Sequence, residues 1–265
     1  MCAKLNQVLS RLIPEGAVKE SFTGAYFSLY YNRKHFKENG FRVYRCGGHF
    51  EYDFDEGVRF SSYENMADEL KRSLKGYLAG YSLKKGDIVI DGGAYIGEFA
   101  LYAAKAVGRE GKVIAFEPDG NMYKKFLANI KLNRIENIIA VNKGLWSSDG
   151  DLKFVGDNIK GYSFMLGPDA GGEVNVPVVS LDNELARLKI EKVDFIKADV
   201  EGAELELIKG AQGTLAASRV NLAIAAYHVL DGEKTSGRVE KMLRDMGYNA
   251  DTAHPGHLTT YARPK

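Results

Sequence analysis

From Gly86 onward, short apolar runs alternate with longer segments of helical character. The runs DIVIDGG, KVIAFEP, NIIAVNKGLW, VDFIKADVEG and VNLAIAAYH are each short enough for a buried strand. Segments such as GEFALYAAKAVGREG, NMYKKFLANIKLN and ELELIKGAQGTLAAS lie between them and read as helices. Strands that alternate with helices of about 10–15 residues indicate a parallel sheet with helices on both faces. We therefore predict an α/β fold with a Rossmann-like, doubly wound sheet.

The N-terminal part has a different composition. Residues 22–63 hold 13 of the 29 aromatic residues, and the stretch from Phe41 to Phe60 alternates and is broken by glycines, which predicts short strands and hairpins. We expect an extension over residues 1–80 (helix, short strands, helix) and a second domain over 81–265 with a hairpin insertion at about 150–175. The aromatic segment could be a lid or wall for a substrate. Because aromatics dominate cores and interfaces in general, we favour a small core or a dimer surface.

Charge and composition exclude several classes of protein. Lys+Arg 36 against Asp+Glu 35 gives a net charge of +1, which lacks the basic excess of a nucleic-acid binder. No apolar run approaches the length of a membrane span, so we expect no membrane partner. The N-terminus lacks the apolar core of a signal peptide, and Cys2 and Cys46 are too few for a disulfide framework. These absences lead us to expect a cytoplasmic protein.

The run VIDGGAYIG joins the first of these strands to a helix through a glycine turn. Glycines there allow close approach of a ligand, and a helix N-terminus offers backbone N–H groups. The spacing of Asp91, Gly93 and Gly97 differs from the G-x-G-x-x-G of dinucleotide loops. A carboxylate here suits a ligand with a cation or hydroxyls and would repel a pyrophosphate. S-adenosylmethionine, which carries an ammonium and a sulfonium, meets this condition, although glycine turns after strands are also common without a ligand.

Glu117 ends the next strand, 26 residues after Asp91. An acidic side chain at this place can accept both hydroxyls of a ribose. An exposed Glu before a proline is unremarkable by itself. Two acids at adjacent strand ends of one βαβ unit, however, indicate a nucleoside-type ligand at the carboxyl edge of the sheet.

Asp199 and His228 follow the fourth and fifth strands and are our candidate catalytic residues. Asp199 could orient an acceptor, act as a general base on a hydroxyl, or bind a metal. Strand geometry would place Glu201 on the same face, whereas Glu201 could instead be an N-cap or first-turn acid of the next helix. His228 could take a hydroxyl proton or be an ordinary hydrogen-bonded loop histidine. The other histidines show no metal-ligand spacing, so we assign no metal site: His35, His49, His254 and His257.

The segments IDGGAYIGEFAL (90–101), FEPDGNMYKKFLANIKLN (116–133), VPVVSLDNEL (176–185) and VDFIKADVEGAELELIKGAQGTL (193–215) resemble the FkbM family of class I S-adenosylmethionine-dependent methyltransferases. The resemblance spans about residues 86–228. It implies a mostly parallel seven-stranded sheet with an antiparallel last strand, and methyl transfer to hydroxyls of sugars, macrolides or other small metabolites. It also implies Asp199 near the methyl group and these cofactor contacts: Asp91, Gly93, Ala94, Gly97, Glu117, Pro118, Gly144, Leu145 and Trp146.

Two departures from the family pattern concern Gly92, where members often have Val, and the AAYH that ends the fifth strand, where many have an acid. The second puts the acceptor side in doubt and leaves Tyr227 and His228 as local substitutes. We expect a small hydroxylated acceptor, no nucleic acid, and a chain that could form a homodimer. The alternatives are a non-catalytic binding protein with this fold, a methyltransferase acting on RNA or protein, and an NAD(P)-dependent oxidoreductase, which the glycine spacing disfavours.

Overall fold

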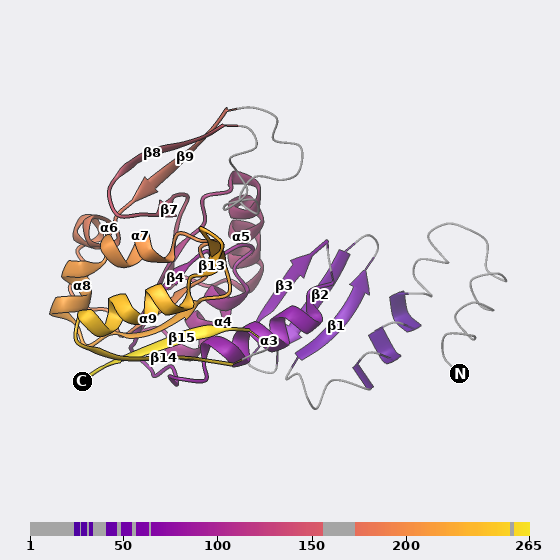
Figure 1. Cartoon of the computed structure of the whole chain (residues 1–265). Helices are drawn as coiled ribbons and strands as arrows, with labels where there is room; N and C mark the ends of the chain where they lie inside the picture. Colours follow the sequence, from indigo (N-terminus) through magenta and orange to yellow (C-terminus); the bar gives the residue numbers. More distant parts are fainter. Residues whose placement is uncertain are drawn as a thin grey trace. The chain divides into compact units, whose positions relative to one another are not determined.

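The computed structural model describes residues 24–26, 28–30, 32–33, 41–46, 49–54, 57–63, 65–155, 173–254 and 257–265. The chain divides into two compact units, Met1–Lys71 and Arg72–Lys265 (Figure 1). The division lies within helix α3 (Ala67–Tyr77). We expected a domain boundary between residues 80 and 81, and that boundary stays a prediction.

The first unit contains a small antiparallel sheet of order β1-β2-β3 (Figure 1). Its strands are β1 (Phe41–Cys46), β2 (His49–Phe54) and β3 (Arg59–Ser62). Alternate residues on them are buried, and the rings of Tyr52 and Phe60 stack with centroids 4.6 Å apart. The buried aromatic residues of this sheet therefore form a small core, as expected of side chains with large apolar area: Phe41, Tyr52, Phe54 and Phe60.

The second unit is built on a seven-stranded sheet of order β14-β15-β11-β10-β4-β5-β6. The inner strands are parallel, while β15 pairs antiparallel with both β11 and β14, so the predicted antiparallel last strand is confirmed. The strands are β4 (Ile88–Gly92), β5 (Lys112–Phe116), β6 (Ile138–Val141), β10 (Phe195–Ala198), β11 (Asn221–Ala225), β14 (Tyr248–Ala253) and β15 (Thr259–Pro264).

Helices cover both faces of this sheet (Figure 1). Successive strand residues point to opposite faces, so Val89 packs with one buried cluster and Ile90 with the other. The first cluster includes residues of α3, α4 (Glu98–Val107) and α5 (Gly120–Asn133). The second includes residues of α6 (Leu181–Leu188), α7 (Glu204–Lys209), α8 (Gln212–Ala217) and α9 (Ser236–Asp245). The predicted α/β fold is thus confirmed.

One strand prediction needs correction, and one strand was missed. The run NIIAVNKGLW is not one strand, because β6 ends at Val141 and β7 (Gly144–Leu145) pairs with β9 (Glu173–Val179) in a separate sheet. β9 also forms an antiparallel hairpin with β8 (Gly150–Val155), as expected for the insertion, whose residues 156–172 lie outside the described part. The strand β14 was not predicted, since YNADTA is largely polar. Two short strands, β12 (Val229–Leu230) and β13 (Glu233–Lys234), follow β11.

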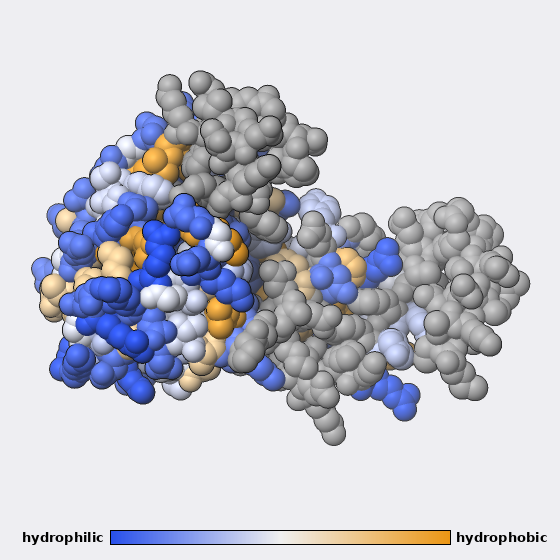
Figure 2. Space-filling view, viewed as in Figure 1, coloured by the Kyte–Doolittle hydropathy of each residue, from blue (hydrophilic) through white to orange (hydrophobic). Residues whose placement is uncertain are grey.

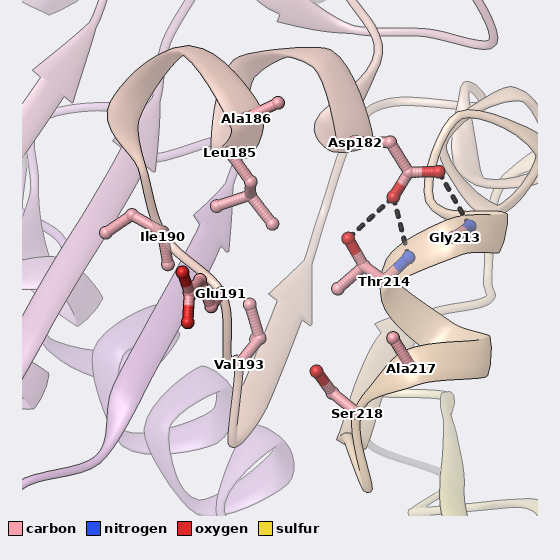
Figure 3. Close-up of a pocket in the computed structure, with 10 residues that line it drawn as sticks. All are labelled: Asp182, Leu185, Ala186, Ile190, Glu191, Val193, Gly213, Thr214, Ala217 and Ser218. Atoms are coloured by element: carbon pink, nitrogen blue, oxygen red, sulfur yellow. Dashed lines mark hydrogen bonds between the residues drawn. The ribbon is translucent and has the colours of Figure 1, made fainter.

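A groove of about 260 Å³ lies between α6 and α8 (Figure 3). Asp182 borders it and accepts hydrogen bonds from the backbone N–H groups of Gly213 (2.7 Å) and Thr214 (2.8 Å). Asp182 therefore holds the start of α8. Ser180 is the N-cap of α6, and its hydroxyl oxygen accepts a hydrogen bond from the N–H of Asn183. None of the residues predicted for the cofactor or for catalysis lines this groove.

The visible surface of the second unit is mostly hydrophilic, with small separate hydrophobic areas (Figure 2). Its exposed large hydrophobic side chains within the described ranges are Leu127, Leu132 and Val229. Among the described residues, no helix is both long and apolar enough to cross a bilayer.

Candidate functional site

The turn between β4 and α4 requires glycine at two positions. Gly93 has φ +76°, and a Cβ there would lie 1.8 Å from the carbonyl oxygen of Asp199. Gly97 has φ +92°, and its Cβ would lie 2.1 Å from the ring of Phe126. Both the left-handed backbone and the close contacts exclude a side chain. The ends of β4 and β10 and the middle of α5 therefore meet at this turn.

The first N–H groups of the turn are already used inside the protein. The N–H groups of Gly93 and Ala94 both donate to the carbonyl oxygen of Phe116, at 3.0 and 2.9 Å. The N–H of Gly97 donates to the carbonyl oxygen of Ala94 at 2.7 Å. The free N–H groups that we expected concern the start of α4, which these three amides precede, so that expectation stays a prediction. The role of the three amides is to fix the shape of the turn.

Asp91 forms a buried ion pair with Lys197. The two side chains come from neighbouring strands in which Asp91 and Lys197 are register partners, and they are 0% and 5% exposed. The ammonium of Lys197 lies 2.8 Å from Asp91 Oδ1 and donates to the carbonyl oxygen of Gly93 at 2.7 Å. Lys197 therefore connects β4, β10 and the glycine turn. Sequence reasoning missed it, although a lysine inside the apolar strand FIKA was a usable signal.

Burial and charge act in opposite directions on this pair. Burial raises the pKa of Asp91, and the charge of Lys197 opposes that rise. Burial also disfavours the charged form of Lys197, but the carboxylates of Asp91 and Asp199 outweigh it and raise the pKa of its ammonium. Because an uncompensated buried charge is costly, we expect both partners to be ionised together.

Glu117 follows β5 and is held by backbone amides on both oxygens. Its Oε2 accepts from the N–H of Tyr95 at 2.7 Å, and its Oε1 accepts from the N–H of Asp119 at 2.9 Å. Tyr95 reaches it in a left-handed conformation with φ 52°. Burial raises the pKa of Glu117 to about 7, although these two amides lower it in part. Each oxygen keeps a second lone pair, so the carboxylate can still accept ligand hydroxyls.

The segment after β6 lies against the same turn. A Cβ at Gly92 would be 3.1 Å from Leu145 Cδ1 and 3.3 Å from side-chain atoms of Val200 and Leu207. A larger residue at position 92 would therefore press on all three neighbours, which accounts for glycine where family members often have Val. Leu145 is buried beside the turn, as is Gly144, while Trp146 is partly buried and its N–H donates to the carbonyl oxygen of Val179. Pro118, directly after Glu117, is also partly exposed at this edge.

Asp199 lies at the centre of a polar cluster beyond the turn. Its Oδ2 accepts from the hydroxyl of Tyr77 at 2.6 Å, and both oxygens are 3.0 Å from the hydroxyl of Tyr227. The Tyr77 hydroxyl is also 3.2 Å from Nε2 of His257. Burial raises the pKa of Tyr77, with the charge of Asp199 as the next cause. Tyr77 and His257 were not predicted, because no local pattern links residues so distant in the chain.

His228 lies beside Asp199, so the structure brings the two predicted catalytic residues together. The Nε2 atom of His228 is 3.5 Å from Asp199 Oδ1 and 3.3 Å from Glu201 Oε2. Its Nδ1 is 2.8 Å from Oε1 of the fully buried Glu204. Neither ring nitrogen has an aligned hydrogen bond within the described residues, so these are charge contacts. Burial lowers the pKa of His228, but Glu201 and Glu204 outweigh it and raise the pKa to about 10.

Glu201 reaches this cluster in a way that strand geometry did not predict. Strand β10 already ends at Ala198, and Glu201 adopts a left-handed conformation with φ 54°. Helix α7 begins at Glu204, so Glu201 is not in its first turn either. The tight turn therefore directs both Asp199 and Glu201 toward His228.

This arrangement of glycine turn, strand-end acids and fold agrees with the comparison with known families. A family model described as a methyltransferase FkbM domain matches residues 91–250, more than half of the chain. The chain belongs to the FkbM methyltransferase family. It is a methyltransferase that uses S-adenosylmethionine, the cofactor of the FkbM family.

Three named methyltransferases are similar to this chain at about the same level of identity. Methyltransferase sdnD of Sordaria araneosa is 28% identical over 63% of this chain and 76% of its own length. Hexuronic acid methyltransferase AglP of Haloferax volcanii is 27% identical over 61% of this chain and 69% of its own. The 31-O-demethyl-FK506 methyltransferase FkbM of Streptomyces tacrolimicus is 27% identical over 64% of this chain and 75% of its own.

Proposed function

We propose that this chain transfers the methyl group of S-adenosylmethionine to a hydroxyl oxygen of a small metabolite such as a sugar or a polyketide. The observation that carries the proposal is the pairing of Asp199 with His228 at the strand ends next to the glycine turn. A carboxylate and an imidazole at this place are suited to removing a hydroxyl proton. The names of two relatives, a hexuronic acid methyltransferase and a 31-O-demethyl-FK506 methyltransferase, support the same class of acceptor.

The residues around the turn fit the cofactor. Its amino acid part would lie against Asp91, Gly93, Ala94 and Gly97, where the two glycines allow the tight backbone of the turn. Its ribose would be held by Glu117 and Pro118, since the Glu117 carboxylate keeps acceptor capacity beyond its two amide bonds. Its adenine would lie along Gly144, Leu145 and Trp146. When bound, the cofactor supplies an electrophilic methyl group on a sulfonium.

The protein's own part in the reaction is to align the acceptor and to remove its proton. We assign proton removal to Asp199, whose carboxylate is oriented by the hydroxyls of Tyr77 and Tyr227. His228 is the second choice as base: its Nε2 lies 3.5 Å from Asp199 Oδ1, and because its pKa is raised to about 10, it could accept a hydroxyl proton only after losing the one it already carries. Tyr227 and His228 replace the acid that many family members have after the fifth strand.

The test is a methylation assay on purified protein with a panel of hydroxylated sugars and polyketides, and mass spectrometry to locate the added methyl group. We expect an oxygen-linked methyl group that depends on the cofactor. Transfer to a nitrogen or carbon atom, or to RNA or protein in place of the small molecules, would overturn the proposal. A protein that binds the cofactor but methylates nothing would favour the non-catalytic alternative.

A further inference from the structure

Three side chains next to the proposed acceptor site converge on one point. A carboxylate oxygen of Asp199, a carboxylate oxygen of Glu201 and a ring nitrogen of His228 all lie within 4.8 Å of one another. Each of the three residues is partly exposed, while the ring nitrogens of His228 are buried. The geometry points to a binding site for a divalent metal ion of the Mn²⁺ or Mg²⁺ type, held by Asp199, Glu201 and His228.

The buried Glu204 is the second and independent observation. Its side chain is 0% exposed, its Oε1 lies 2.8 Å from His228 Nδ1, and its Oε2 has no hydrogen-bond partner within the described residues. A metal-binding histidine almost always directs its other ring nitrogen to a carboxylate or carbonyl, which fixes the tautomer. The Nδ1 contact is not an aligned hydrogen bond, but the charge of Glu204 favours a proton on Nδ1 and leaves Nε2, which faces Asp199 and Glu201, as the ligand atom.

The distances suit a common ion. Two ligands at right angles, each about 2.1 Å from a metal, lie roughly 3 Å apart. His228 Nε2 is 3.5 Å from Asp199 Oδ1 and 3.3 Å from Glu201 Oε2, and the two carboxylates lie within 4.8 Å of each other, so the side chains must move closer together to bind one ion. Two carboxylates favour hard cations, and the imidazole shifts the preference from Mg²⁺ toward Mn²⁺.

The local charge also favours a cation. Asp199, Glu201 and Glu204 surround one imidazole, and in the described part of the chain none of the three forms an ion pair with a lysine or arginine. Lys197, the neighbouring cation, is bonded to Asp91 and to the turn. The competing arrangement is a protonated His228, which would supply a single positive charge in place of the metal's two.

Such an ion would have open positions, because only three protein ligands hold it. If the proposed function is correct, on which this role rests, the acceptor hydroxyl would bind there and its pKa would fall, so that Asp199 need not remove the proton alone. The metal would then be part of the acceptor site and separate from the cofactor site at Asp91 and Glu117.

The test uses the full chain, from which bound metal is first removed with a chelator. Mn²⁺ alone is then added, and electron paramagnetic resonance of the free ion measures how much the protein binds. We expect saturable binding to the wild type. Glu201→Gln, His228→Gln and Glu204→Gln should each weaken it by about 10–100-fold. Glu206→Gln is the matched control, because Glu206 lies on α7 and pairs with Lys209 instead of His228, and should bind like wild type. If His228→Gln fails to fold, Glu201→Gln decides, since its side chain is one-third exposed.

Two results would overturn the metal site: no uptake of Mn²⁺ by the wild type at millimolar concentration, or equal binding by the Glu201→Gln variant. Either result would leave protonated His228 as the partner of the carboxylates. This result is separable from the proposed function. Mn²⁺ binding without oxygen methylation would keep the site and reject the function. Oxygen methylation that is unchanged by a chelator, in a protein without Mn²⁺ binding, would do the reverse.

Discussion

The ammonium of Lys197 and the carboxylate of Asp91 lie 2.8 Å apart, and both are buried beneath the glycine turn. The pair joins two neighbouring strands whose ends carry the site, and Lys197 also bonds to the carbonyl oxygen of Gly93. Asp91 is therefore first a structural anchor for the turn. Its proposed contact with the cofactor depends on Lys197 keeping it in place.

Lys197→Met should be strongly destabilising, because it leaves the Asp91 charge buried without a partner. We expect a loss of about 3–5 kcal/mol in the free energy of unfolding, measured with chemical denaturant. The double variant Lys197→Met with Asp91→Asn should recover part of this loss. Lys192→Met is the matched control, since Lys192 pairs with Asp194 at the surface, and should cost less than about 1 kcal/mol. Equal effects at the two lysines would contradict the buried pair.

Gly93→Ala should abolish measurable cofactor binding and destabilise the fold. The new Cβ would lie 1.8 Å from the carbonyl oxygen of Asp199, and the left-handed backbone alone costs about 1–2 kcal/mol. Calorimetric titration with S-adenosylmethionine and thermal unfolding measure the two effects. Gly120→Ala, at the start of α5 with nothing within 4 Å of its Cβ, should leave both unchanged or slightly improved. Normal affinity in Gly93→Ala would mean that the turn is not where the cofactor binds.

Cofactor affinity should rise with pH up to about 7 and then level off. Burial raises the pKa of Glu117 from 4.5 to about 7, so this group is protonated in much of the folded protein below that pH. Ribose hydroxyls donate best to a carboxylate, so binding should favour the deprotonated form and release a proton. By the same linkage, Glu117 binds its proton more tightly in the folded than in the unfolded protein. Its contribution to the free energy of unfolding is therefore largest below pH 4.5 and is lost as the pH rises toward 7. Titrations with S-adenosylmethionine in buffers on both sides of pH 7 measure the affinity. In the Glu117→Gln variant, the affinity should no longer depend on pH. An affinity that is independent of pH in the wild type would refute the role of Glu117.

Asp199→Asn should lower turnover by about 100–10,000-fold, the range expected for loss of a general base. Cofactor affinity should stay near that of the wild type, because Asp199 lies on the acceptor side. Tyr227→Phe removes one hydroxyl that orients Asp199 and should give a smaller loss of turnover. The measurements are methyl transfer to an identified acceptor and calorimetric cofactor binding. Turnover that is unaffected in Asp199→Asn would remove its catalytic role.

The fold and the separate acids could be read from the sequence for a simple reason. Apolar strands that alternate with helices leave few arrangements other than a parallel sheet, and the carboxyl ends of its strands meet at one edge. Asp91, Glu117, Asp199 and His228 were found in this way. The antiparallel last strand came from family resemblance.

What could not be read depends on which strands become neighbours and on single backbone torsions. Lys197 pairs with Asp91 because β10 lies beside β4, which spacing along the chain does not reveal. Tyr77 meets Asp199 across 122 residues of chain, and His257, 58 residues after Asp199, reaches the same cluster through the Tyr77 hydroxyl. Glu201 turns toward His228 through one left-handed residue, which no periodic pattern predicts.

The contact between the glycine turn and β10 has a consequence for the order of folding. Gly93 lies against the carbonyl oxygen of Asp199, and Lys197 fixes the same turn from a position 106 residues later than Asp91. During synthesis, the first βαβ unit therefore emerges well before the strand that shapes its turn. Contacts so distant in the chain form slowly. We expect cofactor binding to begin only when β10 has paired with β4. In a refolding experiment, the rate at which cofactor binding appears should therefore equal the rate at which β10 joins the sheet.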